Sequence, residues 1–323
     1  MNSQTMYIAN KAIETYKEVK TELRFDGEYI NHFASLVFAD QNENIDIEKI
    51  KEIRKYIKKN TKSLQSFRGD MLYMVSILIS REEAYEEFSD TLIEVNETLK
   101  DNGFKSSPYL VLASYSIVKR SNKSERKRVL TNMKLIYSLL YKEFNNITDD
   151  EDYLICALLA IKFVRDNEEP KEVLKYIESM FNSLLDLENY SRNDLQNIAT
   201  SMLLNSSATA QFEIKDLINE FKENDMKIGD QVLNIISVVA RDEDIRTYVQ
   251  NVKDVVEYLC DEEGEYAFYM DKTFRTMIAI VIVELYERKE SGFTNRYLKE
   301  LLCFSIYSFI ARKKQNVFEE VLA

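Results

Sequence analysis

The sequence predicts an all-α fold, an irregular, α-solenoid-like stack of antiparallel helical hairpins with about fifteen helices. Three observations lead to this prediction. Only 6 of the 323 residues are Gly and only 2 are Pro, whereas the two together make up about 12% of an average protein. The turns of β proteins and the loops that cradle phosphates need these residues, so β-sandwiches, barrels and glycine-loop nucleotide folds are disfavoured. Apolar residues also recur at helical spacing, as at Leu92, Val95 and Leu99.

The third observation is an internal repeat. A segment that begins polar and continues apolar runs over 68–75 and returns over 106–113 and 150–157. Weaker copies follow, and the equivalent positions are Val75, Ala113, Ala157, Ala199, Ile235 and Ala279. Between the copies lies a more charged, amphipathic kind of helix, as over 173–181. Because a period of about 40 residues is typical of two-helix solenoid units, each unit is expected to pair one exposed helix with one buried helix.

The first 60 residues depart from this repeat. Helices are expected near 2–23, 27–39 and 46–59, forming an N-terminal cap over 1–60. The hairpin repeat follows over 61–312 and a tail over 313–323, all within one continuous structural unit.

The few Gly and Pro residues fall at the joints between helices. Gly103 is expected to end one helix in the left-handed conformation. Ser107 and Pro108 are expected to cap and start the next helix. The sequence around Gly292 repeats this design.

Charge and cysteine content indicate which partners and which cellular compartment are expected for the protein. The net charge is -12, so a global basic field for nucleic acid is absent. Three widely spaced cysteines with apolar neighbours are interpreted as reduced, buried thiols. The N-terminus lacks the pattern of a signal peptide, and the longest apolar run, over 277–283, is far shorter than the roughly twenty residues of a membrane span. A cytoplasmic protein without membrane contact is therefore expected.

Residues that could carry chemistry are scarce. The single histidine, His32, excludes sites with several histidines within one chain, and its apolar surroundings favour a structural role. The acidic run over 149–152 resembles the first half of the Mg²⁺-binding motif of all-helical isoprenoid enzymes, but Tyr153 stands where that motif needs Asp. The run is interpreted as an acidic helix N-terminus. We therefore expect no catalytic residue, no metal site and no cofactor.

One basic segment stands out in this acidic chain. Six cationic side chains fall within ten residues: Lys119, Arg120, Lys123, Arg126, Lys127 and Arg128. Such a segment could bind phosphate, nucleic acid or an acidic partner. No aromatic residue is interleaved to stack on bases, which disfavours nucleic acid. The alternative interpretation is a solvated loop between two helices.

Two motifs resemble a family. The sequence Phe-Arg-Gly-Asp-Met-Leu over 67–72, followed by Asn-Gly-Phe-Lys-Ser-Ser-Pro-Tyr-Leu over 102–110, resembles a bacterial all-helical family known as domain of unknown function number four thousand and three. The resemblance covers about residues 9–312 and implies no activity, ligand or catalytic residue. Arg68 and Gly69 are candidate anion-binding residues, because free N–H groups point outward at a helix start. Alternatively, Arg68 only ties its loop to a neighbouring helix.

The leading hypothesis for function is a non-enzymatic helical-repeat scaffold that binds a protein or peptide. Its support is the scarcity of catalytic residue types and the surface that stacked hairpins offer to a partner. The alternatives are a peptide-responsive bacterial regulator and an all-helical enzyme with an unrecognised pocket. The sequence leaves open whether a small molecule binds.

Overall fold

The structure is a computed structural model that describes residues 1–40, 44–62, 66–187, 189–204, 210–237, 244–291 and 297–322. Within these ranges it contains sixteen α-helices, three short 3₁₀ helices and no strand, which confirms the all-α fold. The solenoid-like period of about 40 residues stays a prediction. No helix of the described ranges combines the length and the apolar character that crossing a membrane would require.

The chain divides into two compact units. One unit comprises Asp46–Leu204, and the other comprises Met1–Ile45 together with Asn205–Ala323. The predicted cap over 1–60, repeat region over 61–312 and tail over 313–323 stay predictions. We describe each unit by itself.

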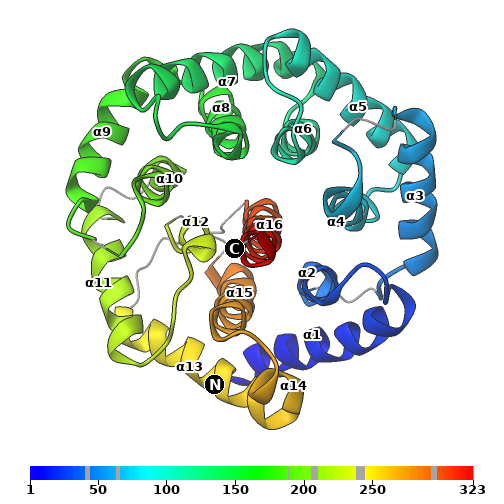
Figure 1. Ribbon diagram of the computed structural model, residues 1–323, viewed down its shortest axis with the longest axis vertical. Coiled ribbons are helices and arrows are strands. Elements are labelled where there is room, and N and C mark those ends of the chain that lie inside the picture. The colour runs from blue at the N-terminus through cyan, green and yellow to red at the C-terminus, as the bar shows by residue number, and fades with distance from the viewer. Residues whose placement is uncertain are drawn as a thin grey trace. The chain divides into compact units, whose positions relative to one another are not determined.

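The unit Asp46–Leu204 is a series of helical hairpins. Its α-helices are α3 (Ile47–Asn60), α4 (Gly69–Ile79), α5 (Tyr85–Asp101), α6 (Pro108–Arg120), α7 (Lys123–Glu143), α8 (Tyr153–Arg165), α9 (Val173–Leu184) and α10 (Arg192–Met202). The 3₁₀ helices η1 (Asp150–Asp152) and η2 (Pro170–Glu172) precede α8 and α9. Neighbours in sequence pack in pairs, α3 on α4, α5 on α6, α7 on α8 and α9 on α10. The helices α4, α6, α8 and α10 also contact one another in order, so the hairpins form two rows (Figure 1).

The two rows differ sharply in burial, as the sequence predicts. In α6 every residue from Tyr109 to Val118 is buried, and in α8 every residue from Tyr153 to Ile161. In α5 and α7 the buried residues recur about every three or four positions. One face of each of these helices covers the row formed by α4, α6, α8 and α10, and the other face meets water. The six equivalent positions of the repeat, which lie on α4, α6, α8, α10, α12 and α15, are all fully buried.

The second unit holds both ends of the chain. Its α-helices are α1 (Ser3–Glu22), α2 (Glu28–Phe38), α11 (Ala210–Glu223), α12 (Leu233–Ile236), α13 (Ile245–Glu262), α14 (Gly264–Phe268), α15 (Lys272–Ser291) and α16 (Leu298–Leu322), with η3 (Asp230–Val232) before α12. Helix α1 packs on α2, α13 and α15, and α2 packs on α16 as well (Figure 1). The bounds of α1, α2 and α3 agree closely with the three helices expected in the first 60 residues.

The cysteines are free thiols, and their burial follows the expectation only in part. Cys156 and Cys303 are buried, and burial raises the pKa of both thiols. Cys260 is half-buried instead, and its sulfur accepts a hydrogen bond from Nη1 of Arg275 at 3.3 Å.

The joint between α5 and α6 confirms the predicted roles of its residues. Gly103 has φ +96°, and its N–H donates to the carbonyl of Lys100 at 2.9 Å. The N–H of Phe104 reaches the carbonyl of Leu99 at 3.2 Å, which completes the glycine-dependent helix end. Oγ of Ser107 then accepts from the N–H of Leu110 at 3.2 Å and caps α6. The similar joint expected at Gly292 lies outside the described residues.

The positive φ of Gly103 leads to a stability prediction. Gly103→Ala is expected to lower the free energy of unfolding by about 1–2 kcal/mol, because a Cβ is strained in the left-handed conformation. Gly264→Ala is the control, since a Cβ there meets only ordinary contact, with Cδ2 of Phe268 at 3.8 Å. Urea denaturation measures both. Equal effects of the two substitutions would contradict the prediction.

Candidate functional site

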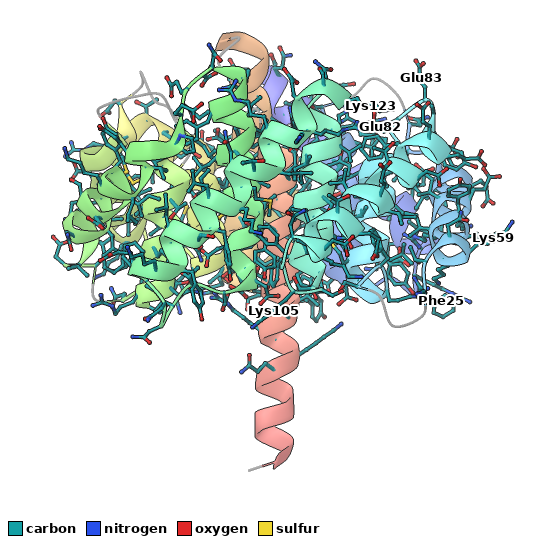
Figure 2. The ribbon with its side chains drawn as sticks, turned by 90° about the horizontal axis from the view of Figure 1, so that it is seen from above. Phe25, Lys59, Glu82, Glu83, Lys105 and Lys123 are labelled. Carbon is teal, nitrogen blue, oxygen red and sulfur yellow. The ribbon has the colours of Figure 1, made fainter. Side chains whose placement is uncertain are left out.

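The basic segment predicted from the sequence lies at the end of α6 and the start of α7. Two of its members are paired. Nζ of Lys119 lies 2.6 Å from Oε1 of Glu82, and Arg128 lies 3.5 Å from Oε1 of Glu169. Lys123 and Lys127 are exposed and form no ion pair with any described residue. In Figure 2, Lys123 projects at the same end of its unit as Glu82.

The positive charge continues along the outer side of α7. Lys134 is exposed two turns after Lys127 and likewise has no ion pair within the described ranges. The large side chains Leu135 and Tyr141 are 41% and 53% exposed on the same helix. Lys123, Lys127, Lys134 and Tyr141 share one side of α7, and Leu135 lies on the adjoining side. We call these five residues the basic face of α7. The density of charge in the sequence predicted Lys123 and Lys127, but it did not predict Lys134, Leu135 or Tyr141.

The remaining cations of the basic segment are less available. Arg126 is half-buried, and its Nε is shielded from solvent without a hydrogen-bond partner. Arg120 is half-buried at the end of α6 and takes part in a further interaction there. The segment is therefore not one uniform charged patch.

Arg68 is bonded to the end of the preceding helix. Its Nη1 donates to Oγ1 of Thr61 at 2.6 Å, and its Nη2 donates to the carbonyl oxygen of Thr61 at 2.9 Å. A third bond, from Nη1 at 2.6 Å, goes to the carbonyl of Phe67. Gly69 follows with φ +57° as the first residue of α4. These contacts correspond to the alternative in which Arg68 ties its loop to a neighbouring helix. Anion binding at Arg68 and Gly69 stays a prediction.

The acidic run over 149–152 builds a helix start. Oδ1 of Asp149 accepts the N–H of Glu151 at 2.8 Å, and Oδ2 of Asp152 accepts the N–H of Asp149 at 2.9 Å. The side chain of Asp152 is fully buried, and its Oδ1 accepts from Nε2 of Gln196 on α10 at 3.0 Å. Burial, outweighing the bond from the backbone of Asp149, raises the pKa of Asp152 to about 8. Asp152 therefore carries a proton at neutral pH and serves the packing of α8 on α10.

His32 occupies an unusual position in the second unit. It lies on α2, it is only 1% exposed, and neither Nδ1 nor Nε2 has a hydrogen-bond partner among the residues that the structure describes. A neutral imidazole has one N–H donor, and leaving such a donor unsatisfied in the interior costs about 1–3 kcal/mol. Burial and the positive charge of Lys20 lower the pKa of His32 to about 3, so the imidazole is neutral at physiological pH.

Aromatic rings hold the imidazole of His32 in one orientation. The ring of Tyr16 stacks on it with centroids 3.7 Å apart and planes only 5° from parallel. Tyr266 and Phe274 approach at 5.5 and 5.8 Å with planes near 60° to the imidazole. The ring is therefore fixed by contacts from α1, α14 and α15.

Two carboxylates lie next to this imidazole. Ligand atoms of Glu28, His32 and Glu265 all lie within 4.8 Å of one another. Glu28 and His32 are four residues apart on α2 and so share one face of the helix, whereas Glu265 comes from α14. Sequence analysis interpreted His32 as structural and missed both carboxylates. The spacing of Glu28 to His32 was a usable signal, but nothing local to Glu265 marks it.

The carboxylates differ in their surroundings. Glu265 accepts from the hydroxyl of Tyr16 and from Nζ of Lys20, each at 2.6 Å. Burial of Glu265 acts in the opposite direction, but these two bonds outweigh it and lower the pKa of Glu265. Partial desolvation of its carboxyl group and the nearby charge of Glu265 raise the pKa of Glu28. The negative charge of Glu265 is thus compensated by Lys20 and Tyr16. A bound cation would stabilise the ionised form of Glu28.

The raised pKa of Asp152 gives a prediction for stability against pH. Between the ordinary carboxyl pKa of 3.8 and about 8, the folded chain holds a proton that the unfolded chain has lost. The contribution of Asp152 to stability therefore falls as pH rises, by up to about 1.4 kcal/mol per pH unit. Asp152→Asn removes this titration, and a flip of the Gln196 amide keeps the hydrogen bonds in place. The free energy of unfolding is measured by urea denaturation at several pH values from 5 to 7. It should fall more steeply with rising pH in the wild type than in Asp152→Asn, and parallel dependences on pH would contradict the prediction.

Comparison with known proteins places the chain in a family. No curated protein matches it, and no solved structure does. The sequence model of one family, described as a protein of unknown function (DUF4003), matches residues 15–315 and so covers both units. The chain belongs to this uncharacterised family, DUF4003.

Proposed function

We propose that the chain is a non-enzymatic helical scaffold that binds an acidic segment of a partner protein through the basic face of α7. One observation carries the proposal. Three exposed lysines that form no ion pair with a described residue, Lys123, Lys127 and Lys134, lie on the same helix as exposed Leu135 and Tyr141, in a chain whose net charge is -12. Cations that the chain itself leaves unpaired favour a partner of opposite charge.

The two kinds of side chain on this face have complementary effects. Exposed lysines speed the encounter with an acidic segment and select against basic ones, and they add little affinity of their own. Affinity comes mainly from apolar and aromatic anchors that lose water on binding. Leu135 and Tyr141 supply such anchors on the same helix. A partner segment with carboxylates and an apolar residue therefore fits this face better than a purely acidic one.

A protein partner suits the basic face better than nucleic acid does. Phosphate groups are bound most tightly by arginine in a two-pronged arrangement, but Arg128 already bonds to Asn167 and Glu169, and Arg126 is half-buried. The exposed cations of α7 that form no ion pair with a described residue are the lysines of the basic face. A peptide-responsive regulator and an all-helical enzyme remain the alternative functions.

A peptide selection tests this proposal. Random peptides displayed on phage are selected against the full chain, and the isolated peptides are measured by fluorescence anisotropy. We expect the selected peptides to be rich in Asp and Glu with at least one apolar residue. We also expect the triple substitution Lys123→Gln, Lys127→Gln and Lys134→Gln to weaken binding at least about tenfold, because it removes the three unpaired cations.

The control has the same change of charge elsewhere in the same unit. Lys55, Lys58 and Lys59 are exposed on α3, and replacing all three by Gln should leave binding within about twofold. The proposal is contradicted if the selected peptides are not enriched in Asp and Glu. It is also contradicted if the two triple variants lose equal amounts of binding affinity. A labelled single-stranded DNA is the second probe. Tight binding that depends on the α7 lysines would instead assign this face to nucleic acid.

A further inference from the structure

We propose that Glu28, His32 and Glu265 form a binding site for a divalent transition-metal cation of the class of Zn²⁺ or Mn²⁺. The site lies wholly within the unit Met1–Ile45 and Asn205–Ala323. It is independent of the basic face of α7, which belongs to the other unit, so either proposal can fail without the other.

The first support is the arrangement of the three ligand groups. Glu28 and His32 project from one face of α2, and Glu265 reaches them from the first turn of α14. Their ligand atoms lie within 4.8 Å of one another. In a tetrahedral site, two ligands that each lie about 2.1 Å from one Zn²⁺ ion are roughly 3.4 Å apart. The three ligand atoms must therefore come closer together, and the exposed side chain of Glu28 can rotate to do so.

The second support is the buried imidazole, which is independent of the two carboxylates. Within the described part of the chain, both ring nitrogens of His32 lack a hydrogen-bond partner, although the side chain is only 1% exposed. The ring is clamped by Tyr16, Tyr266 and Phe274, so it is fixed before any ligand arrives. An imidazole held in this way, with a free nitrogen beside two carboxylates, has the chemistry of a metal ligand.

Lys20 has a defined part in this proposal. Its Nζ lies 2.6 Å from Oε2 of Glu265, and the lysine side chain is 54% exposed. The ammonium group therefore neutralises Glu265 and can swing into solvent when a cation with two charges replaces it. Tyr16 keeps its bond to Oε1 of Glu265 and would orient the carboxylate as an outer hydrogen-bond partner.

The donor set selects the class of metal. One imidazole nitrogen and two carboxylate oxygens suit Zn²⁺, Mn²⁺ or Fe²⁺. Mg²⁺ and Ca²⁺ prefer sites made only of oxygen and gain little from the imidazole. Three protein ligands also leave at least one position of the ion open to water or another ligand.

The single histidine makes the test specific. In the full chain labelled with ¹⁵N-histidine, all imidazole signals come from His32. We expect Zn²⁺ to shift the resonance of one ring nitrogen with a micromolar dissociation constant, and Mn²⁺ to broaden the same signals. Mg²⁺ at equal concentration should leave them in place. Isothermal titration calorimetry gives the stoichiometry, which is expected to be one Zn²⁺ in this site.

Variants separate metal binding from a packing role. Glu28→Gln and Glu265→Gln should each weaken Zn²⁺ binding at least about tenfold. Glu263→Gln is the matched control, because it removes the same charge two residues before Glu265 from a group that pairs with Lys17. Lys20→Met should tighten Zn²⁺ binding, since it removes the ammonium that competes for Glu265. A purely structural cluster predicts no such gain.

The outcomes that overturn the proposal are equally specific. The proposal is wrong if the imidazole signals of His32 do not move at millimolar Zn²⁺. It is also wrong if these signals respond equally to Zn²⁺ and Mg²⁺. Equal binding by Glu28→Gln and Glu263→Gln would also contradict it. Glu28 is exposed, so its variant is expected to fold, and the test does not depend on the stability of a His32 variant.

Discussion

The complete burial of one helix in each hairpin is the constraint on which the rest of this structure depends. A helix such as α6 satisfies its own backbone groups, and it releases free energy by removing apolar side chains from water on every side, at about 25 cal/mol per Å². Its few polar residues must then find partners locally. Ser114 donates to the carbonyl of Leu110 at 2.7 Å and accepts from Asn96 of α5 at 3.1 Å. Ser114 therefore joins α6 to α5 while its hydroxyl group is satisfied.

Departures from this rule are informative, because an unsatisfied polar group in a packed interior costs stability that a function can justify. Asp152 obeys the rule, since burial raises its pKa and two hydrogen bonds hold its oxygens. His32 breaks it, because its ring is fixed among aromatic side chains while neither nitrogen has a hydrogen-bond partner in the described ranges. The interior of the unit Met1–Ile45 and Asn205–Ala323 thus holds one imidazole beside two carboxylates.

Much of the fold followed from local signals in the sequence. Gly103 and Ser107 mark a helix end and a helix start through short-range hydrogen bonds, and the repeat positions from Val75 to Ala279 are all buried. The cluster around His32 depended on tertiary contacts instead. Glu28 was within reach because it precedes His32 by one helical turn, but Glu265 meets them only through the packing of α14 near α1 and α2. Pairing of Lys119 with Glu82 likewise depends on the fold.

The proposed metal site requires that the buried imidazole of His32 binds a cation and is not simply part of the core. Anomalous X-ray diffraction at the zinc edge, from crystals of the full chain grown with Zn²⁺, tests it most directly. If the proposed site exists, we expect an anomalous peak about 2.1 Å from a ring nitrogen of His32 and from carboxylate oxygens of Glu28 and Glu265. Peaks only at exposed carboxylates, with none beside His32, would contradict it.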